Sequence, residues 1–177
     1  MKFLTLALLF IGLCFFSSTT FAQEDSPNEN TPIFYRNSLG VAAGGTTGLG
    51  ISYRHFFPNK FGFQVTGIPI FSQNHFYSST GLSLMYIFRE HERVALFSYL
   101  GNHVIYTEDN YYGGSILWDE EPIQYSYLTY NIGLGAGVNI HLWDFIDLSV
   151  KVGYGVFDIP NGVYTNLTGG IGAYYNF

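Results

Sequence analysis

The chain has 177 residues, of which 47% are hydrophobic, 19% aromatic and only 11% charged. Soluble globular domains carry about 25% charged residues, so this composition argues against an ordinary soluble protein. A formal charge of −6 makes nucleic acid an implausible partner. The 21 glycines, 15 tyrosines and 17 phenylalanines are instead typical of β-structure in contact with lipid.

The first 22 residues have the pattern of a secretory signal peptide. Lys2 precedes an apolar run over residues 3–16, and small and polar residues lead to Ala22, after which we expect cleavage. The run is shorter than the ~20 residues that span a bilayer, which disfavours a retained membrane helix. Cys14 lies inside this segment and follows a bulky Leu13, so neither a lipid anchor nor a disulfide is expected.

Residues 23–36 are polar, acidic and interrupted by proline, and we interpret them as a flexible periplasmic leader. From residue 37 to the end, extended segments and turns alternate without a helical pattern. Eight strands are predicted, at residues 37–44, 49–57, 61–71, 79–89, 93–107, 125–142, 145–157 and 163–177.

The clearest strand signal covers residues 127–142, where every even position is apolar or aromatic. The odd positions are small or polar and carry no formal charge, among them Gly133, Gly135 and Gly137. Such a period of two gives a strand two unlike faces. A face that suits hydrocarbon, opposite a small and polar face, predicts a membrane-spanning barrel with lipid outside and a filled interior.

The flanking strands are less uniform. In 49–57 the odd positions should face lipid while Ser52, Arg54 and Phe56 face inward, and in 61–71 Gln64 and Thr66 face inward. Pro69 predicts a bulge or an early strand end. The fifth strand is compatible with either register, and the sequence alone leaves that choice open.

The connections alternate in length. Residues 58–60, 90–92 and 143–144 form tight turns, whereas residues 72–78, 108–124 and 158–162 form longer connections. Outer-membrane barrels have short periplasmic turns and longer external loops, and an even strand number places both termini in the periplasm. We therefore expect the longer set outside, with the short connection at 45–48 as an exception.

Residues 37–177 resemble the small eight-stranded outer-membrane β-barrels, the OmpA/OmpX-like group of Gram-negative bacteria. The resemblance lies in the strand-turn-strand segment 48–65 (GLGISYRHFFPNKFGFQV) and the final strand 171–177 (IGAYYNF). It is similar in particular to "outer membrane protein β-barrel domain" proteins without an attached periplasmic domain. The resemblance implies localisation in the outer membrane and recognition of Tyr175 and Phe177 by the barrel-assembly machinery.

An eight-stranded barrel has an interior filled by its own side chains, so an open diffusion pore is not expected. Arg54, Asp147 and Lys151 fall on the inward face, where lone charges are costly and pairs are favoured. Counting from the turns, we expect Arg54 and Asp147 to pair near the periplasmic end. A structural network is the favoured role, and a proton or ion path is the alternative.

The histidines at 55, 75, 91, 103 and 141 have no metal-ligand spacing, and no cofactor motif is present, so neither a metal nor a cofactor is predicted. A lipid-modifying barrel enzyme would need a serine, a histidine and an acid near the external rim. His103 with Glu108 is the acid–base pair available there, and Ser78, Ser79 and Ser115 are the possible nucleophiles.

The third external connection brings together acids and aromatic side chains. Its acids are Glu108, Asp109, Asp119, Glu120 and Glu121, and Trp118 is its largest aromatic residue. A solvated face is the simplest interpretation. The alternative is a contact surface, in which aromatic residues anchor an unknown surface ligand and the acids bind divalent cations that crosslink anionic lipid sugars.

The sequence predicts an all-β, eight-stranded, antiparallel transmembrane barrel, with Trp143, Phe145, Tyr175 and Phe177 in the periplasmic aromatic girdle. A non-enzymatic structural or surface-interaction role is the first functional hypothesis, and a lipid-modifying enzyme is the second. A soluble ligand-carrying barrel would need an apolar interior and a wet exterior, the reverse of the predicted faces.

Overall fold

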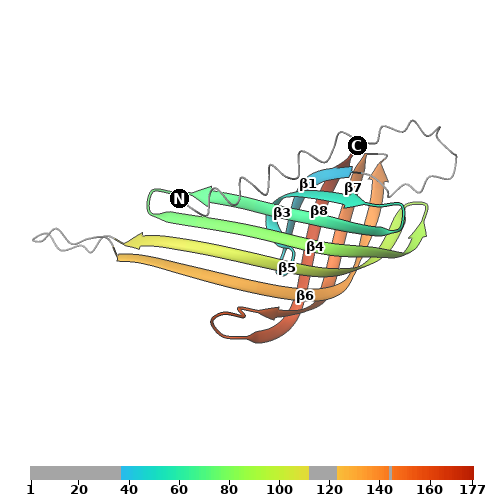
Figure 1. Cartoon of the computed structure of the whole chain (residues 1–177). Coiled ribbons are helices and arrows are strands. Elements are labelled where there is room, and N and C mark those ends of the chain that lie inside the picture. Colours follow the sequence, from blue (N-terminus) through green and yellow to red (C-terminus); the bar gives the residue numbers. More distant parts are fainter. Residues whose placement is uncertain (1–36, 112–122, 144) are drawn as a thin grey trace, which may run out of the picture. The chain divides into compact units, whose positions relative to one another are not determined.

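The computed structural model describes residues 37–111, 123–143 and 145–177, so the predicted signal peptide and leader lie outside the described residues. Eight antiparallel strands pair in chain order and close into a barrel through β1 and β8 (Figure 1). The strands are β1 (Asn37–Gly44), β2 (Gly48–Phe56), β3 (Phe61–Phe71), β4 (His75–His91), β5 (Val94–Tyr111), β6 (Ile123–Trp143), β7 (Ile146–Phe157) and β8 (Tyr164–Asn176). The prediction of an all-β, eight-stranded antiparallel barrel is confirmed.

The two ends of the barrel differ. We call the end with connections 57–60, 92–93 and 144–145 the turn end, and the end with connections 45–47, 72–74, 112–122 and 158–163 the loop end. β4, β5 and β6 extend far past β1 at the loop end (Figure 1). Much of the predicted loop sequence is therefore strand, and Glu108 and Asp109 belong to β5.

Aromatic contacts between neighbouring strands support this extension. Phe71 of β3 lies 4.9 Å from Phe76 of β4, measured between ring centroids, and Phe76 lies 5.9 Å from Tyr106 of β5. Cross-strand aromatic pairs of this kind stabilise a sheet beyond its hydrogen bonds. Strand pairing consequently continues from β4 through β6 where turn-like composition suggested loops.

Two ambiguities in the strands are settled by the pairing. In β5 the odd positions, including Phe97, Tyr99 and His103, face the lumen and are buried. The prediction of a bulge or strand end at Pro69 was wrong, because β3 pairs with β4 without a shift from Phe61 to Phe71. β3 has no β2 partner beyond Gly67, so the missing N–H of Pro69 breaks no ladder bond on that side.

Large apolar side chains cover the exterior, and polar ones fill most of the lumen. Ile51, Leu134 and Ile171 are 64%, 66% and 68% exposed, whereas Ser52, Arg54 and Gln64 are at most 1% exposed. The lumen also holds an apolar cluster, made of Phe56, Met85, Ile87, Ala95, Phe97 and Tyr99. No helix among the described residues is long and apolar enough to cross a bilayer.

The connection between β1 and β2 folds into the lumen. We call residues 45–47 the inner tip, because Thr46 and Thr47 are only 1% and 4% exposed. β2 pairs with β3 only from Ile51 onward, and the strand also contacts β4 and β5. Gly48 and Gly50 adopt positive φ angles of 88° and 132° at this bend, a conformation that glycine adopts without strain.

Glycines on four other strands make room for the inner tip. A Cβ added to Gly81 would lie 2.2 Å from the Thr47 carbonyl oxygen, and one on Gly101 would lie 2.6 Å from that of Thr46. A Cβ on Gly133 or Gly155 would lie 2.8 Å from Thr46 Cγ2. We call Gly81, Gly101, Gly133 and Gly155 the glycine ring; it gives the tip space that any larger residue would occupy.

This packing makes Gly81→Ala destabilising, because the new methyl group would meet backbone atoms of the inner tip. We expect a loss of about 1–3 kcal/mol in the free energy of unfolding, measured by denaturant titration of the refolded barrel in detergent. Gly169→Ala is the matched control, since its Cβ would meet its nearest atom at an ordinary 3.5 Å. Equal stabilities of the two variants would contradict the proposed packing.

Candidate functional site

The structure brings Arg54 of β2 and Asp147 of β7 together inside the lumen. Arg54 Nη2 donates to Asp147 Oδ2 at 2.8 Å, and Arg54 Nη1 donates to Asn139 Oδ1 at 2.8 Å. His141 Nδ1 lies 2.6 Å from the second carboxylate oxygen of Asp147. We call these four residues the lumen network. In it both carboxylate oxygens of Asp147 have a hydrogen-bond partner, whereas a lone buried carboxylate would be costly.

Lys151 does not contact Asp147 but joins a second polar chain. Its Nζ donates to Gln64 Oε1 at 2.6 Å, and Gln64 Nε2 donates to Thr66 Oγ1 at 2.9 Å. Thr66 then bonds to Ser52, and Ser52 Oγ lies 3.3 Å from the Tyr174 hydroxyl. The predicted group of three charges is thus one ion pair with a separate lysine.

Tyr174 connects the two sets. The Arg54 guanidinium carbon lies 4.1 Å from the centroid of its ring, within the range of a cation–π contact. Lys151 Nζ is 5.4 Å from the Tyr99 ring centroid. Both lumenal cations therefore lie against aromatic faces, which compensates part of the cost of removing them from water.

A third polar cluster anchors the inner tip. Asn131 Nδ2 donates to the Gly45 carbonyl at 3.2 Å, and His103 Nδ1 lies 3.1 Å from the same oxygen. A carbonyl only accepts, so Nδ1 carries the proton and Nε2 of the neutral ring accepts from Ser79 Oγ at 2.8 Å. Ser79 Oγ in turn accepts from the Leu49 N–H at 3.0 Å. β4, β5 and β6 thereby hold the β1–β2 hairpin.

The catalytic set considered from the sequence is not assembled. His103 and Glu108 are five positions apart in a strand whose pairing is continuous, so they occupy opposite faces of β5. Glu108 instead accepts from the Tyr106 hydroxyl at 3.0 Å. Ser78 lies next to Ser79 on the opposite face of β4, and Ser115 lies outside the described residues.

The acidic connection is described only in part. Glu108 and Asp109 lie near the loop end of β5, and Asp109 Oδ1 bonds to His75 Nδ1. Trp118, Asp119, Glu120 and Glu121 lie outside the described residues. Within the part of the chain that the structure describes, no three potential ligands are grouped to hold a metal ion.

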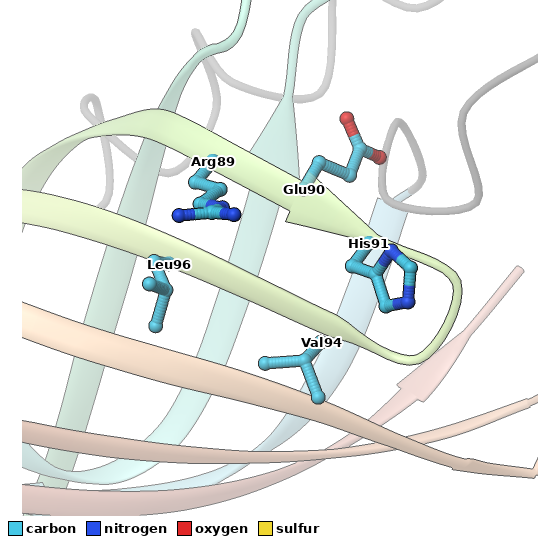
Figure 2. Close-up of a pocket in the computed structure, with 5 residues that line it drawn as sticks. All are labelled: Arg89, Glu90, His91, Val94 and Leu96. Atoms are coloured by element: carbon cyan, nitrogen blue, oxygen red, sulfur yellow. The ribbon is translucent and has the colours of Figure 1, made fainter.

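The structure places the predicted girdle residues at the turn end. Trp143, Phe145, Tyr175 and Phe177 are all exposed on the exterior, and the Phe145 and Tyr175 rings lie 6.0 Å apart. A shallow pocket at the same end is lined by Arg89, Glu90, His91, Val94 and Leu96, next to a shift in the β4–β5 pairing (Figure 2). Glu90 points away from Arg89 there, so these charges do not converge on one point.

Sequence reasoning missed the inner tip and its contact with Ser79 and His103. The available signals were the two threonines in a connection of only three residues and the inward register of His103. Neither signal shows that the connection bends inward, because its partners lie 30 to 122 positions further along the chain.

No protein-family model and no curated protein matches the chain. Similar solved structures include the N-terminal β-barrel domain of Pseudomonas aeruginosa OprF, with 16% identity, a TM-score of 0.46, and coverage of 80% of this chain and 98% of that one. Ail, the attachment invasion locus protein of Yersinia pestis, has 18% identity, a TM-score of 0.44, and coverage of 80% and 97%. Neisserial surface protein A has 17% identity, a TM-score of 0.44, and coverage of 80% and 95%.

A double-mutant cycle tests the ion pair in the lumen network. Arg54→Met and Asp147→Asn should each cost about 3–5 kcal/mol, because each leaves the other group buried without its partner. The double variant should be more stable than the sum predicts, with a coupling of about 1 kcal/mol or more in denaturant unfolding. As a control, the losses in unfolding free energy of Asp147→Asn and of His103→Gln, at the inner tip, should be close to additive. Additive losses for Arg54→Met and Asp147→Asn would count against direct contact between these two residues.

Proposed function

We propose that the chain is an outer-membrane β-barrel of a Gram-negative bacterium that has no enzymatic activity and acts through the surface at its loop end. The observation that carries the proposal is the inverted distribution of side chains. Val152 and Leu167 are 63% and 72% exposed on the exterior, whereas Arg54, Asp147 and Lys151 are buried in the lumen. A bilayer favours this arrangement, since a cation at mid-membrane on the lipid face would cost about 2–4 kcal/mol.

In this orientation the turn end faces the periplasm and the loop end faces outward. The exposed aromatic residues at the turn end then lie at the inner membrane–water interface, where such side chains are favoured. Tyr175 and Phe177 at this end are the residues that we propose the barrel-assembly machinery recognises. After cleavage of the signal peptide, the leader at residues 23–36 would lie in the periplasm.

The filled lumen supports a role other than transport. The inner tip contacts glycines on β4, β5, β6 and β7, and the lumen network and the apolar cluster occupy the space below it. An eight-stranded barrel leaves little more volume than these side chains need. The parts able to meet a partner are therefore the extended strands and connections of the loop end.

A lipid-modifying enzyme is the second candidate, and the Ser79–His103 hydrogen bond of 2.8 Å is the observation in its favour. The surroundings favour a structural role. Ser79 and His103 are 0% and 4% exposed, and a backbone carbonyl, rather than a carboxylate, faces His103 Nδ1. We propose that the pair holds the inner tip in place.

Membranes from cells that produce the protein test both points. Carbonate washing should leave the chain in the membrane fraction and detergent should release it, because its exterior is apolar. Mass spectrometry of the lipids should give the same species for the wild type and for the Ser79→Ala variant. Release by carbonate would contradict the proposed membrane location. A lipid species that is lost in the Ser79→Ala variant would contradict the proposal that the protein has no enzymatic activity.

The acids of the third connection support a cation-dependent contact with anionic lipid sugars. Among the described residues, the loop end carries the acids Glu108, Asp109 and Asp158. The turn end carries both signs, with Lys60, Arg89 and Arg93 beside Glu90 and Glu92. The sequence has no lysine or arginine between residues 94 and 150. We propose that Asp119, Glu120 and Glu121 bind divalent cations there.

Calcium should therefore change the fluorescence of Trp118 in a Trp143→Phe background, in which Trp118 is the one remaining tryptophan. The matched control replaces Asp119 by Asn and both Glu120 and Glu121 by Gln, and it should not respond. If calcium changed neither the fluorescence spectrum nor the thermal stability of the Trp143→Phe protein, the proposal that this connection binds divalent cations would be ruled out.

A further inference from the structure

The barrel wall is incomplete at the loop end. β8 has β1 partners only from Gly170 onward, so its residues 164–168 have no strand on that side, although β7 pairs with them on the other. Likewise residues 68–71 of β3 pair with β4 and have no β2 partner. We call this interruption between β3 and β8 the wall gap. It exists because the β1–β2 hairpin ends early and bends into the lumen.

Each edge of the wall gap has one position that cannot donate to an added strand, although the backbone groups of Phe71 and Thr165 also face the gap. The pairs β1–β8 and β2–β3 use odd-numbered residues of β8 and β3, as the Gly45–Gly169 and Phe57–Phe61 bonds show. By the same alternation Pro69 and Leu167 direct their backbone groups toward the gap. Pro69 has no N–H, and the Leu167 N–H donates to Asn166 Oδ1 at 2.8 Å. Capped edges of this kind disfavour β-pairing with another chain.

The lumen face beside the wall gap carries large apolar and aromatic side chains together with two smaller polar ones, Thr107 of β5 and Asn166 of β8, whereas the lumen face below it is mostly polar. The alternation that buries Gln64, Ser79, His103, Lys151 and Thr168 continues toward the loop end with no shift in register. It places five large side chains on that face: Ile70, Tyr77, Ile105, Phe157 and Tyr164. We call these five residues the loop-end mouth.

The described barrel covers the loop-end mouth only in part, since Tyr77, Ile105 and Phe157 are half-buried. Ile70 and Tyr164 flank the wall gap and are 45% and 54% exposed. The Tyr164 and Phe157 rings stack with centroids 5.4 Å apart, and a Cβ added to Gly45 of the inner tip would lie 3.3 Å from Phe157. The inner tip therefore lies directly against this set of side chains, beside the interruption of the barrel wall.

We propose that the loop-end mouth binds an acyl chain of an outer-leaflet membrane lipid, which enters through the wall gap. The inference rests on the proposed membrane location. The exterior on both sides of the gap is apolar and exposed, with Leu167 at 72% and Phe71 at 73%, so acyl chains already contact its edges. A chain passing between β3 and β8 covers Ile70 and Tyr164 without needing a backbone partner. The capped positions and the mostly apolar lining both fit this occupant better than they fit a peptide strand.

The test uses the full mature chain in phosphatidylcholine vesicles that contain a phosphatidylcholine with a photoreactive diazirine at the end of one acyl chain. Illumination followed by peptide mass spectrometry should label Ile70, Phe157 or Tyr164 on the lumen face as well as Leu167 on the exterior. Ile70→Asn should lower the labelling of Phe157 and Tyr164 relative to Leu167 by about tenfold, since it replaces an aliphatic side chain that the acyl chain would cover by a polar one.

Leu134→Asn is the matched control, because it changes an aliphatic residue on the exterior of β6, away from the wall gap, and should leave lumen-face labelling unchanged. Labelling confined to the exterior, or equal lumen-face labelling in the Ile70→Asn variant, overturns the proposal. A second sample contains photoreactive palmitate in place of the phosphatidylcholine probe. Lumen-face labelling by the palmitate alone overturns the claim that the bound chain belongs to a membrane lipid entering through the wall gap. Absence of labelling at Leu167 as well would instead refute insertion of the barrel in the bilayer, so the two failures are distinguishable.

Discussion

The structure depends on fitting a backbone turn into a lumen that has room for little more than side chains. Thr46 and Thr47 are buried because four strands present glycine at the level of the inner tip, and a methyl group at Gly81 would already overlap with the Thr47 carbonyl. The hydrogen bonds of the Gly45 carbonyl to His103 and Asn131 satisfy a backbone oxygen that would otherwise be buried without a donor. The short first hairpin, the wall gap and the closed lumen all follow from this packing.

Volume is equally limited in the lower lumen, where large residues are paired with glycines on the neighbouring strand. A Cβ added to Gly137 of β6 would lie 2.3 Å from the Phe97 ring of β5, and one on Gly135 would lie 2.9 Å from the Tyr99 ring. Gly153 of β7 makes similar room for the Tyr99 hydroxyl. Polar groups then occupy what the rings leave, and Arg54 uses both an aromatic face and a carboxylate to remain charged in that space. The glycines of β6 thus serve interior packing, as their alternation with apolar residues predicted.

Alternation along each strand was enough to predict the barrel, its strand number and the inward position of Arg54, because lipid exposure imposes a period of two that needs no knowledge of partners. It failed where the outcome depends on pairing. The register of β5 could not be chosen because both of its faces are apolar, and only the glycines of β6 explain why Phe97 and Tyr99 point inward. Pro69 was misread for a related reason, since its cost depends on whether β2 is present beside it. The inner tip could not be foreseen, because the residues that accept it are distant in the sequence.

The alternation of side chains along a strand decides where His103 and Glu108 point, once the pairing of β5 is known. Their odd separation excludes a shared site in a regular strand, so His103 is left with Ser79 and the Gly45 carbonyl as partners. A serine and a histidine at hydrogen-bonding distance usually invite a catalytic interpretation, but here the serine oxygen already accepts from Leu49 and is sealed beneath the hairpin that it holds. The polar groups that could have done chemistry are therefore used to hold the inner tip. What remains open to the surroundings is the lining above the tip, where Ile70 and Tyr164 are exposed, and it is there that we propose an acyl chain binds.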